Sequence, residues 1–229
     1  MKKYLSYIGA IRPAGFMLRT ETDRVLSLSM VFSTALIIAR MIYTGQHTFV
    51  FLLWNLFLAW LPYAFTNWAQ LRPKWRTGKR FVLLFTVWLL FIPNSFYIIT
   101  DLFHLGYNFS VPIWFDLVLI LSFAWNGLLL GLLSVRQMEK MMQRYLPGRH
   151  ELLFIYPVMW LNALGVYIGR YLRFNSWDVI TNPFVLIADI LDLLVHPIQY
   201  RTAWGMIACF SVFMTLMYIA VKRISKVIH

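Results

Sequence analysis

Six long apolar runs divide this chain, and they restrict its fold more than any other feature. They cover residues 25–43, 49–66, 81–100, 111–134, 152–172 and 203–221. A helix advances about 1.5 Å per residue, so roughly 18 or more apolar residues can cross a hydrocarbon layer about 30 Å thick. Hydrophobic residues make up 60% of the chain and charged residues 13%, against roughly 45–50% and 25% in soluble domains. The runs therefore predict an all-α fold, a polytopic membrane helix bundle with six transmembrane helices.

The basic residues between the runs predict the orientation of these helices. Lys and Arg in short loops are retained in the cytoplasm. They gather before the first run and after the second, fourth and sixth runs, and only Arg40, Arg170, Arg173 and Arg201 lie elsewhere. We therefore expect a bacterial cytoplasmic (inner) membrane protein with both termini in the cytoplasm. Residues 1–24 would form a basic leader, 25–221 the transmembrane domain and 222–229 a basic tail.

The charge and the cysteine content restrict the partners. A formal net charge of +12 in a soluble chain would suggest nucleic acid, but here the basic residues lie between apolar runs and are explained by topology. We expect membrane lipids as partners, together with homo- or hetero-oligomers in the membrane, and no nucleic acid. The single cysteine, Cys209, excludes an internal disulfide and a multi-cysteine metal cluster. The sequence gives no indication of a cofactor, so any cofactor is unknown at this point.

Residues 179–200 are apolar but carry Asp189, Asp192 and a proline near each end. This segment is too polar for a lipid-facing span. A helix that lies at the outer interface, or re-enters the bundle between the fifth and sixth spans, is expected instead.

A first polar motif follows Pro93 near the outer end of the third run. Proline removes a helix hydrogen bond, so a kinked or broken helix is expected. Asn94, Tyr97, Asp101 and His104 follow at spacings of three, four and three, and on a continuing helix they share one face. Asp101 could orient His104 as a general base. The spacing of Asp101 and His104 is also a weak indication of a metal site. The alternative is a structural hydrogen bond between these two side chains at the level of the lipid headgroups.

Asp116 lies just inside the fourth run. A hairpin of the third and fourth runs would bring it to the depth of Asp101, where the two carboxylates could form a paired site. A carboxylate in the first turn of a helix is also stabilised by the exposed amides, and considered alone this capping role is favoured.

A second polar motif follows the fifth run. Arg170 and Arg173 are three positions apart, and on one helical face their forked donors would suit a phosphate or a carboxylate. Asn175, Trp177 and Asp178 follow, with the tryptophan expected at the interface. Two structural alternatives remain: an ion pair between Asp178 or Asp101 and one of these arginines, or arginines that reach toward lipid headgroups.

Both motifs carry a resemblance to a known family. The residues concerned are Phe91 to Asn94, Tyr97, Thr100, Asp101, His104, Trp114, Asp116, Ser122 to Trp125, Gly169, Arg170, Arg173 to Asp178, Asn182 and Pro183. From about Trp54 onward the chain resembles a bacterial integral-membrane family, domain of unknown function 1361, with Ser95 and Phe96 where Ala-Pro is expected. The resemblance implies a multi-helix membrane protein and supplies no activity.

The polar residues of the two motifs suggest an extracytoplasmic vestibule. We expect it to bind an anionic or amphipathic ligand, such as a lipid headgroup or a cell-envelope precursor, and it is open whether a reaction follows. A transporter, or the substrate-capturing subunit of one, is the second hypothesis. A structural or assembly partner in a membrane complex is the third.

Overall fold

The computed structural model describes residues 21–106, 110–145 and 151–227, and every regular element in these ranges is helical. The prediction of an all-α fold is confirmed. The long helices are α1 (Glu21–Thr44), α2 (Phe51–Gln70), α3 (Gly78–Tyr97), α4 (Ile113–Met142), α5 (Leu152–Tyr167) and α8 (Arg201–Val227). The short elements are α6 (Asp178–Thr181), α7 (Pro183–Val195), the 3₁₀ segments η1 (Pro73–Trp75) and η2 (Ile98–His104), and the π-helical segment η3 (Ile168–Leu172).

Five helical stretches are long and apolar enough to cross a membrane. They are α1, α3 with η2, α4, α5 with η3, and α8. The second predicted run, residues 49–66, corresponds to α2, which has 20 residues but includes polar groups such as Asn55 and Asn67. By helix length and hydropathy, the described residues therefore form a multi-pass membrane protein with five candidate spans. Most of the predicted leader, residues 1–20, lies outside the described residues, as do residues 228–229, and α8 continues through Lys222 into the predicted tail.

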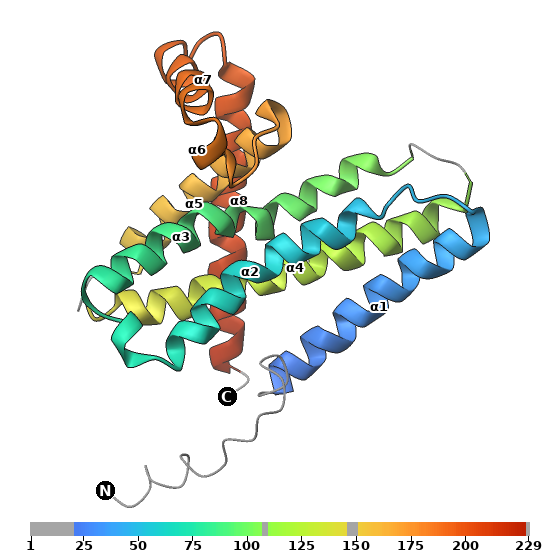
Figure 1. The fold of residues 1–229 in the computed structure, drawn as a ribbon, viewed down its shortest axis with the longest axis horizontal. Coiled ribbons are helices and arrows are strands. Elements are labelled where there is room, and N and C mark those ends of the chain that lie inside the picture. Colours follow the sequence, from blue (N-terminus) through green and yellow to red (C-terminus); the bar gives the residue numbers. More distant parts are fainter. Residues whose placement is uncertain (1–20, 107–109, 146–150, 228–229) are drawn as a thin grey trace, which may run out of the picture.

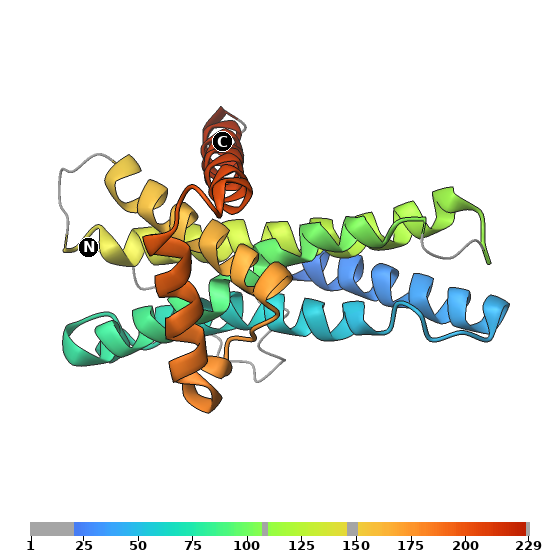
Figure 2. The ribbon, with the colours of Figure 1, turned by 90° about the horizontal axis from the view of Figure 1, so that it is seen from above.

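The helices are arranged as a bundle with a crossing pair. Helices α2, α3 and α4 run side by side, and α1 packs on α4 (Figure 1). Helix α5 packs against α3 and α8, and α8 crosses the direction of α2, α3 and α4 steeply (Figure 2). The short helices α6 and α7 lie at one edge of this bundle, near the start of α8 (Figure 1), and Leu193 of α7 belongs to its hydrophobic core.

Glycines allow α4 and α5 to approach α3 closely around its proline. A Cβ on Gly131 would lie 2.9 Å from Cβ of Ser95, and one on Gly165 would lie 2.6 Å from Cγ of Pro93. Small residues at such crossings are typical of membrane helix packing. Pro93 stays inside α3, and the helix changes type a few residues later, where η2 begins.

Helix α7 leaves much of its apolar surface exposed. Leu186 and Leu193 are buried, whereas Phe184 and Leu191 are exposed. With 13 residues, α7 is about 20 Å long and cannot cross a bilayer. The expectation that residues 179–200 do not form a further simple span is consistent with this length.

Candidate functional site

Four polar side chains meet where α3 continues into η2, and we call them the Arg170 cluster: Arg170, Tyr97, Asp101 and His104. Nη1 of Arg170 lies 3.4 Å from both the Tyr97 hydroxyl and Oδ1 of Asp101, and Nη2 lies 3.3 Å from Nε2 of His104. The guanidinium carbon also lies 5.4 Å from the ring centre of Phe103. The structure thus brings together residues from both predicted motifs, although 66 positions separate His104 from Arg170.

The ion pair in this cluster is withdrawn from solvent. The side chain of Asp101 is 1% exposed and that of Arg170 is 15% exposed. Asp101 also accepts a 2.8 Å hydrogen bond from Nδ2 of Asn55 in α2. A buried carboxylate needs such partners, because an unpaired charge away from water costs several kcal/mol. Asn55 was not among the predicted site residues, and the only signal for it in the sequence is an amide within an apolar run.

The geometry of η2 explains why Asp101 and His104 face the same arginine. A 3₁₀ helix has three residues per turn, so side chains three apart lie in line. The two residues therefore share a face, as predicted, although on a tighter helix than expected. Asn94 lies on the preceding α-helical turn and takes no part in the contacts of Arg170.

The π-helical segment η3 positions Arg170 and separates it from Arg173. Short π-helical segments are rare and frequently occur at functional sites. The segment ends at Leu172, and the next residue, Arg173, has a φ of 61° and is exposed. The two arginines therefore do not share one helical face, and the predicted double fork is not formed, because the left-handed residue turns the chain out of the helix.

Asn94 connects the two motifs beside the cluster. Its Nδ2 donates hydrogen bonds of 2.9 Å to the carbonyl of Phe91 and to the hydroxyl of Ser176. The Ser176 hydroxyl in turn donates to the carbonyl of Leu90 at 3.1 Å. The loop that follows η3 is thereby attached to α3 through side-chain and backbone groups.

Asp178 organises its own loop and does not pair with an arginine. Its carboxylate accepts the backbone amide of Asn175 at 2.6 Å and the hydroxyl of Thr181 at 2.8 Å. These donors hold the pKa of Asp178 below its usual range. Within the described ranges the carboxylate has no salt bridge. The ion pair that was expected for either Asp178 or Asp101 is therefore formed by Asp101 with Arg170, and local donors take its place at Asp178. Trp177 lies nearby, edge-on to Trp54 at 6.3 Å.

Asp116 pairs with Arg40 and does not share a site with Asp101. Nε of Arg40 lies 2.7 Å from Oδ1 of Asp116, and both side chains are almost fully buried. Asp101 has its own partners in Asn55 and Arg170, so the two carboxylates do not share a site. Asp116 does lie in the first turn of α4, the position on which the favoured capping role rests, and its carboxylate also binds a side chain of α1.

A cavity of about 340 Å³ lies next to the Arg170 cluster. Apolar side chains of α2, α3, α5 and α7 line most of it, among them Leu58, Leu161 and Leu186. The polar side chains that line it are uncharged: Asn55, Asn94, Tyr97, Asn175 and Ser176. Asn55 and Tyr97 are also the residues that Asp101 and Arg170 hold, so the buried ion pair orients part of the lining. We call this the α3/α5 cavity.

A second buried ionic network lies at the opposite end of α4 and was missed from the sequence. Glu139 accepts hydrogen bonds from Arg136, Tyr218 and Lys222 at 2.5–2.6 Å. Asp116 and Glu139 lie near opposite ends of one long helix, so about 35 Å separates them at about 1.5 Å per residue. The pattern of charges alone could not identify this network, because the residues resemble ordinary cytoplasmic loop charges.

The described ranges contain no group of three His, Cys, Asp or Glu side chains that could hold a metal ion. At Asp101 and His104, the guanidinium of Arg170 already lies against both side chains. A cation in that position disfavours a metal ion at the same place.

These features define a multi-pass α-helical membrane protein with a polar cluster and a cavity near one end of its bundle. The chain belongs to the family described as protein of unknown function (DUF1361), whose family model matches residues 54–217. The resemblance seen in the sequence is therefore confirmed over that range. No curated protein and no solved structure matches the chain.

Proposed function

We propose that the protein crosses the bacterial inner membrane six times, with both termini in the cytoplasm. Helix α2 supplies the sixth span, since its 20 residues suffice for a bilayer and it packs against both α3 and α4. The basic connection between α2 and α3 meets the basic segment that follows α4 at one end of the bundle. There the Tyr145 hydroxyl contacts both the carbonyl of Arg76 and the amide of Gly78. Lys222 reaches Glu139 at the same end of α4. This gathering of basic segments supports one cytoplasmic face.

Helix α7 then lies at the outer interface. Its exposed apolar side chains, such as Phe184 and Leu191, suit the boundary between lipid and headgroups. Asp192 accepts hydrogen bonds from Tyr200 and His196, and the bond from the Tyr200 hydroxyl lowers the pKa of this carboxyl group. An ionised Asp192 favours the aqueous side of the interface over a re-entrant position.

The function that the geometry supports best is binding of an amphipathic ligand in the α3/α5 cavity, such as a lipid or a lipid-linked cell-envelope precursor. The observation that carries this proposal is the composition of the lining: apolar walls with uncharged amide and hydroxyl groups. Pockets of this kind hold an apolar body while a few polar groups fix its orientation. The absence of charge from the described lining favours an amphipathic ligand over a purely anionic one.

In this arrangement the Arg170 cluster positions the lining and has no catalytic role. Neither Asp101, His104 nor Arg170 lines the cavity, and the guanidinium contacts the other two side chains. Asp101 instead holds the amide of Asn55, and Arg170 holds the hydroxyl of Tyr97. The buried ion pair thus supports binding by orienting these two groups.

Photolabelling with a diazirine-bearing lysophospholipid tests the proposal. Leu161 lines the cavity, so Leu161→Trp should fill it and reduce labelling of peptides from α3 and α5 several-fold. Leu121→Trp is the matched control, because Leu121 is exposed on α4 and does not line the cavity. Equal labelling of α3 and α5 in the wild type and both variants would contradict the proposal.

A further inference from the structure

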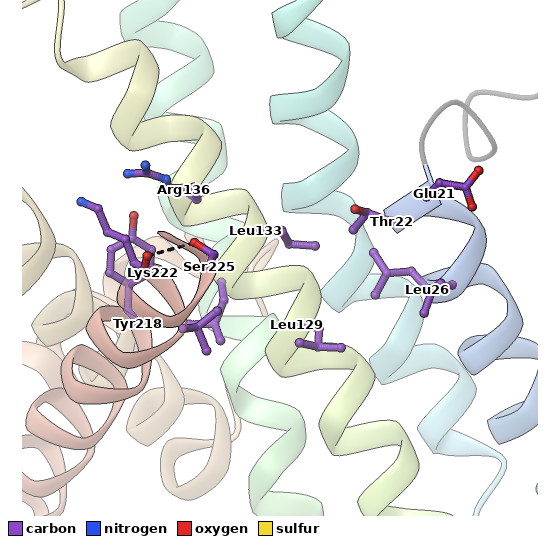
Figure 3. A pocket seen from close by; sticks show the side chains of 12 residues that line it. Glu21, Thr22, Leu26, Leu129, Leu133, Arg136, Tyr218, Lys222 and Ser225 are labelled. Carbon is purple, nitrogen blue, oxygen red and sulfur yellow. Dashed lines mark hydrogen bonds between the residues drawn. The ribbon is translucent and has the colours of Figure 1, made fainter. Parts of the chain in front are cut away.

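A cavity of about 460 Å³ lies between α1, α4 and α8, close to Glu139. Its walls are mainly apolar. Figure 3 shows Leu26 on α1 facing Leu129 and Leu133 on α4 across the opening. Arg136 and Lys222 lie on the opposite side from α1, where α4 and α8 meet (Figure 3). The cavity therefore combines an apolar groove with a cationic corner.

The charges in this corner do not cancel. Two carboxylates, Glu139 and Glu151, face three cations, Arg136, Lys222 and Arg223. Glu151 lies outside the spans, and its hydrogen bond from Lys222 holds the pKa of this carboxyl group below its usual range, so Glu151 is ionised at neutral pH. Glu21 also lines the cavity, on the α1 side, and is paired with Arg24 at 2.9 Å, so one positive charge remains in excess at the α4/α8 corner.

Arg136 is the cation placed to meet an additional anion. Lys222 is 5% exposed and contacts both carboxylates, whereas Arg136 is 33% exposed. A guanidinium has five N–H donors, and the hydrogen bond from Arg136 to Glu139 comes from Nη1. The remaining donors can bind a phosphate in the forked geometry that arginine favours.

We propose that this cavity binds one anionic phospholipid, with an acyl chain along the leucine walls and the phosphate at Arg136. Charge complementarity selects this occupant, because a lipid without net charge would leave the excess positive charge unmatched. A basic residue near a membrane surface contributes about 1 kcal/mol toward binding of anionic lipid, roughly fivefold in affinity. This site is separate from the α3/α5 cavity and is independent of the function proposed for it.

Native mass spectrometry of the full chain can test the proposal, with phosphatidylglycerol and phosphatidylcholine of identical acyl chains as probes. We expect preferential retention of phosphatidylglycerol. Arg136→Gln should reduce this preference about fivefold, whereas Lys140→Gln removes the same charge from an exposed position of α4 outside the cavity and should not. If both variants lost the preference for phosphatidylglycerol equally, the preference would come from general surface charge, and the proposal would be overturned.

A second variant remains informative if Arg136→Gln disturbs folding through Glu139. Leu133→Trp fills the apolar wall without changing any charge and should lower retention of phosphatidylglycerol several-fold, in contrast to Leu121→Trp on the same helix. Unchanged retention in Leu133→Trp would place the lipid elsewhere and overturn the proposal.

The source of the occupant can also be distinguished directly. A benzophenone side chain at position 133 should crosslink to phosphatidylglycerol in vesicles that contain it. Crosslinking to residues 1–20, which precede Glu21 at the edge of the cavity, or equal crosslinking to phosphatidylcholine, would contradict the proposal.

Discussion

Arg40 of α1 and Asp116 of α4 form a buried, two-point ion pair across 76 positions of sequence. Nε of Arg40 lies 2.7 Å from Oδ1 of Asp116, and Nη2 lies 3.2 Å from Oδ2. The two side chains are 2% and 3% exposed, and the guanidinium also lies 4.6 Å from the ring centre of Phe49. This pair attaches the end of α1 to the start of α4. Each of the two buried charges is compensated by the other.

Removing one partner of this pair should destabilise the protein strongly. Asp116→Asn leaves the positive charge of Arg40 buried without its counter-ion, which is expected to cost about 3–5 kcal/mol. The free energy of unfolding in detergent measures the effect. The double variant Arg40→Met with Asp116→Leu removes both charges and should recover much of the loss, and a double variant as unstable as Asp116→Asn would contradict this explanation.

The close approach of α5 to α3 makes a second prediction. Gly165→Ala places a methyl group 2.6 Å from Cγ of Pro93, and the helices must separate to accommodate it. We expect a loss of about 1–3 kcal/mol, measured by thermal unfolding. Gly205→Ala in α8 is the control, since the methyl group that it adds would have no neighbour within 4 Å, and it should stabilise the helix by roughly 0.5–1 kcal/mol. Similar losses in both variants would argue against close packing at Pro93.

The pKa of Asp178 predicts a pH dependence. Because its folded pKa lies below the ordinary value, the carboxylate stabilises the folded state above about pH 4, the unfolded pKa. That contribution is lost as the pH falls through the folded pKa. Asp178→Asn should therefore be less stable than the wild type at about pH 6, and the difference in stability should disappear as the pH falls below the folded pKa of Asp178. A constant difference across this range would show that ionisation of Asp178 does not matter.

The two arginines of the second motif should respond differently to the same change. Arg170→Lys keeps the charge but loses the fork that contacts Tyr97, Asp101 and His104, so we expect a loss of about 1–3 kcal/mol together with reduced photolabelling of the α3/α5 cavity. Arg173→Lys alters an exposed side chain and should change stability by less than about 0.5 kcal/mol. Labelling at the wild-type level in a folded Arg170→Lys variant would remove the proposed positioning role.

Accessibility of introduced cysteines tests the orientation. With Cys209 replaced by Ser, a cysteine at Ser110 should react with a membrane-impermeant maleimide added outside the cell. Cysteines at Lys74 and after His229 should react only after the membrane is opened. Gly106 lies in the same connection as Ser110 but has a φ of 87°, so Ser110 is the less strained position. Labelling of Lys74→Cys from outside would exclude the proposed topology.

The fold was predictable from the sequence because hydropathy acts locally. Each of the six apolar runs corresponds to a long helix. The length of an apolar run is enough to predict such a helix, whatever the rest of the chain does. The weakest run became α2, where Asn55 lowers the hydropathy and is a partner of Asp101. The change to a 3₁₀ segment after Tyr97 and the π-helical segment at Arg170 could not be predicted, because packing between helices decides them.

The site was predictable only in part, because charge partners are chosen in three dimensions. The spacing of Asp101 and His104 predicted a shared face, and burial cost predicted a nearby cation. The particular partner could not be inferred: Arg40 binds Asp116, Arg170 binds Asp101, and Asp178 binds donors of its own loop. Sequence separation contains no information about which of these pairings the packing permits.

The most direct test of ligand binding is a density map of the protein in lipid nanodiscs made from native membrane lipid. We expect elongated density in the α3/α5 cavity, between Leu58, Leu161 and Leu186, with its polar end at Asn94 and Tyr97. A map that resolves these side chains and contains only water between them, with Arg170 still bound to Asp101, would contradict the proposal that this cavity binds an amphipathic ligand.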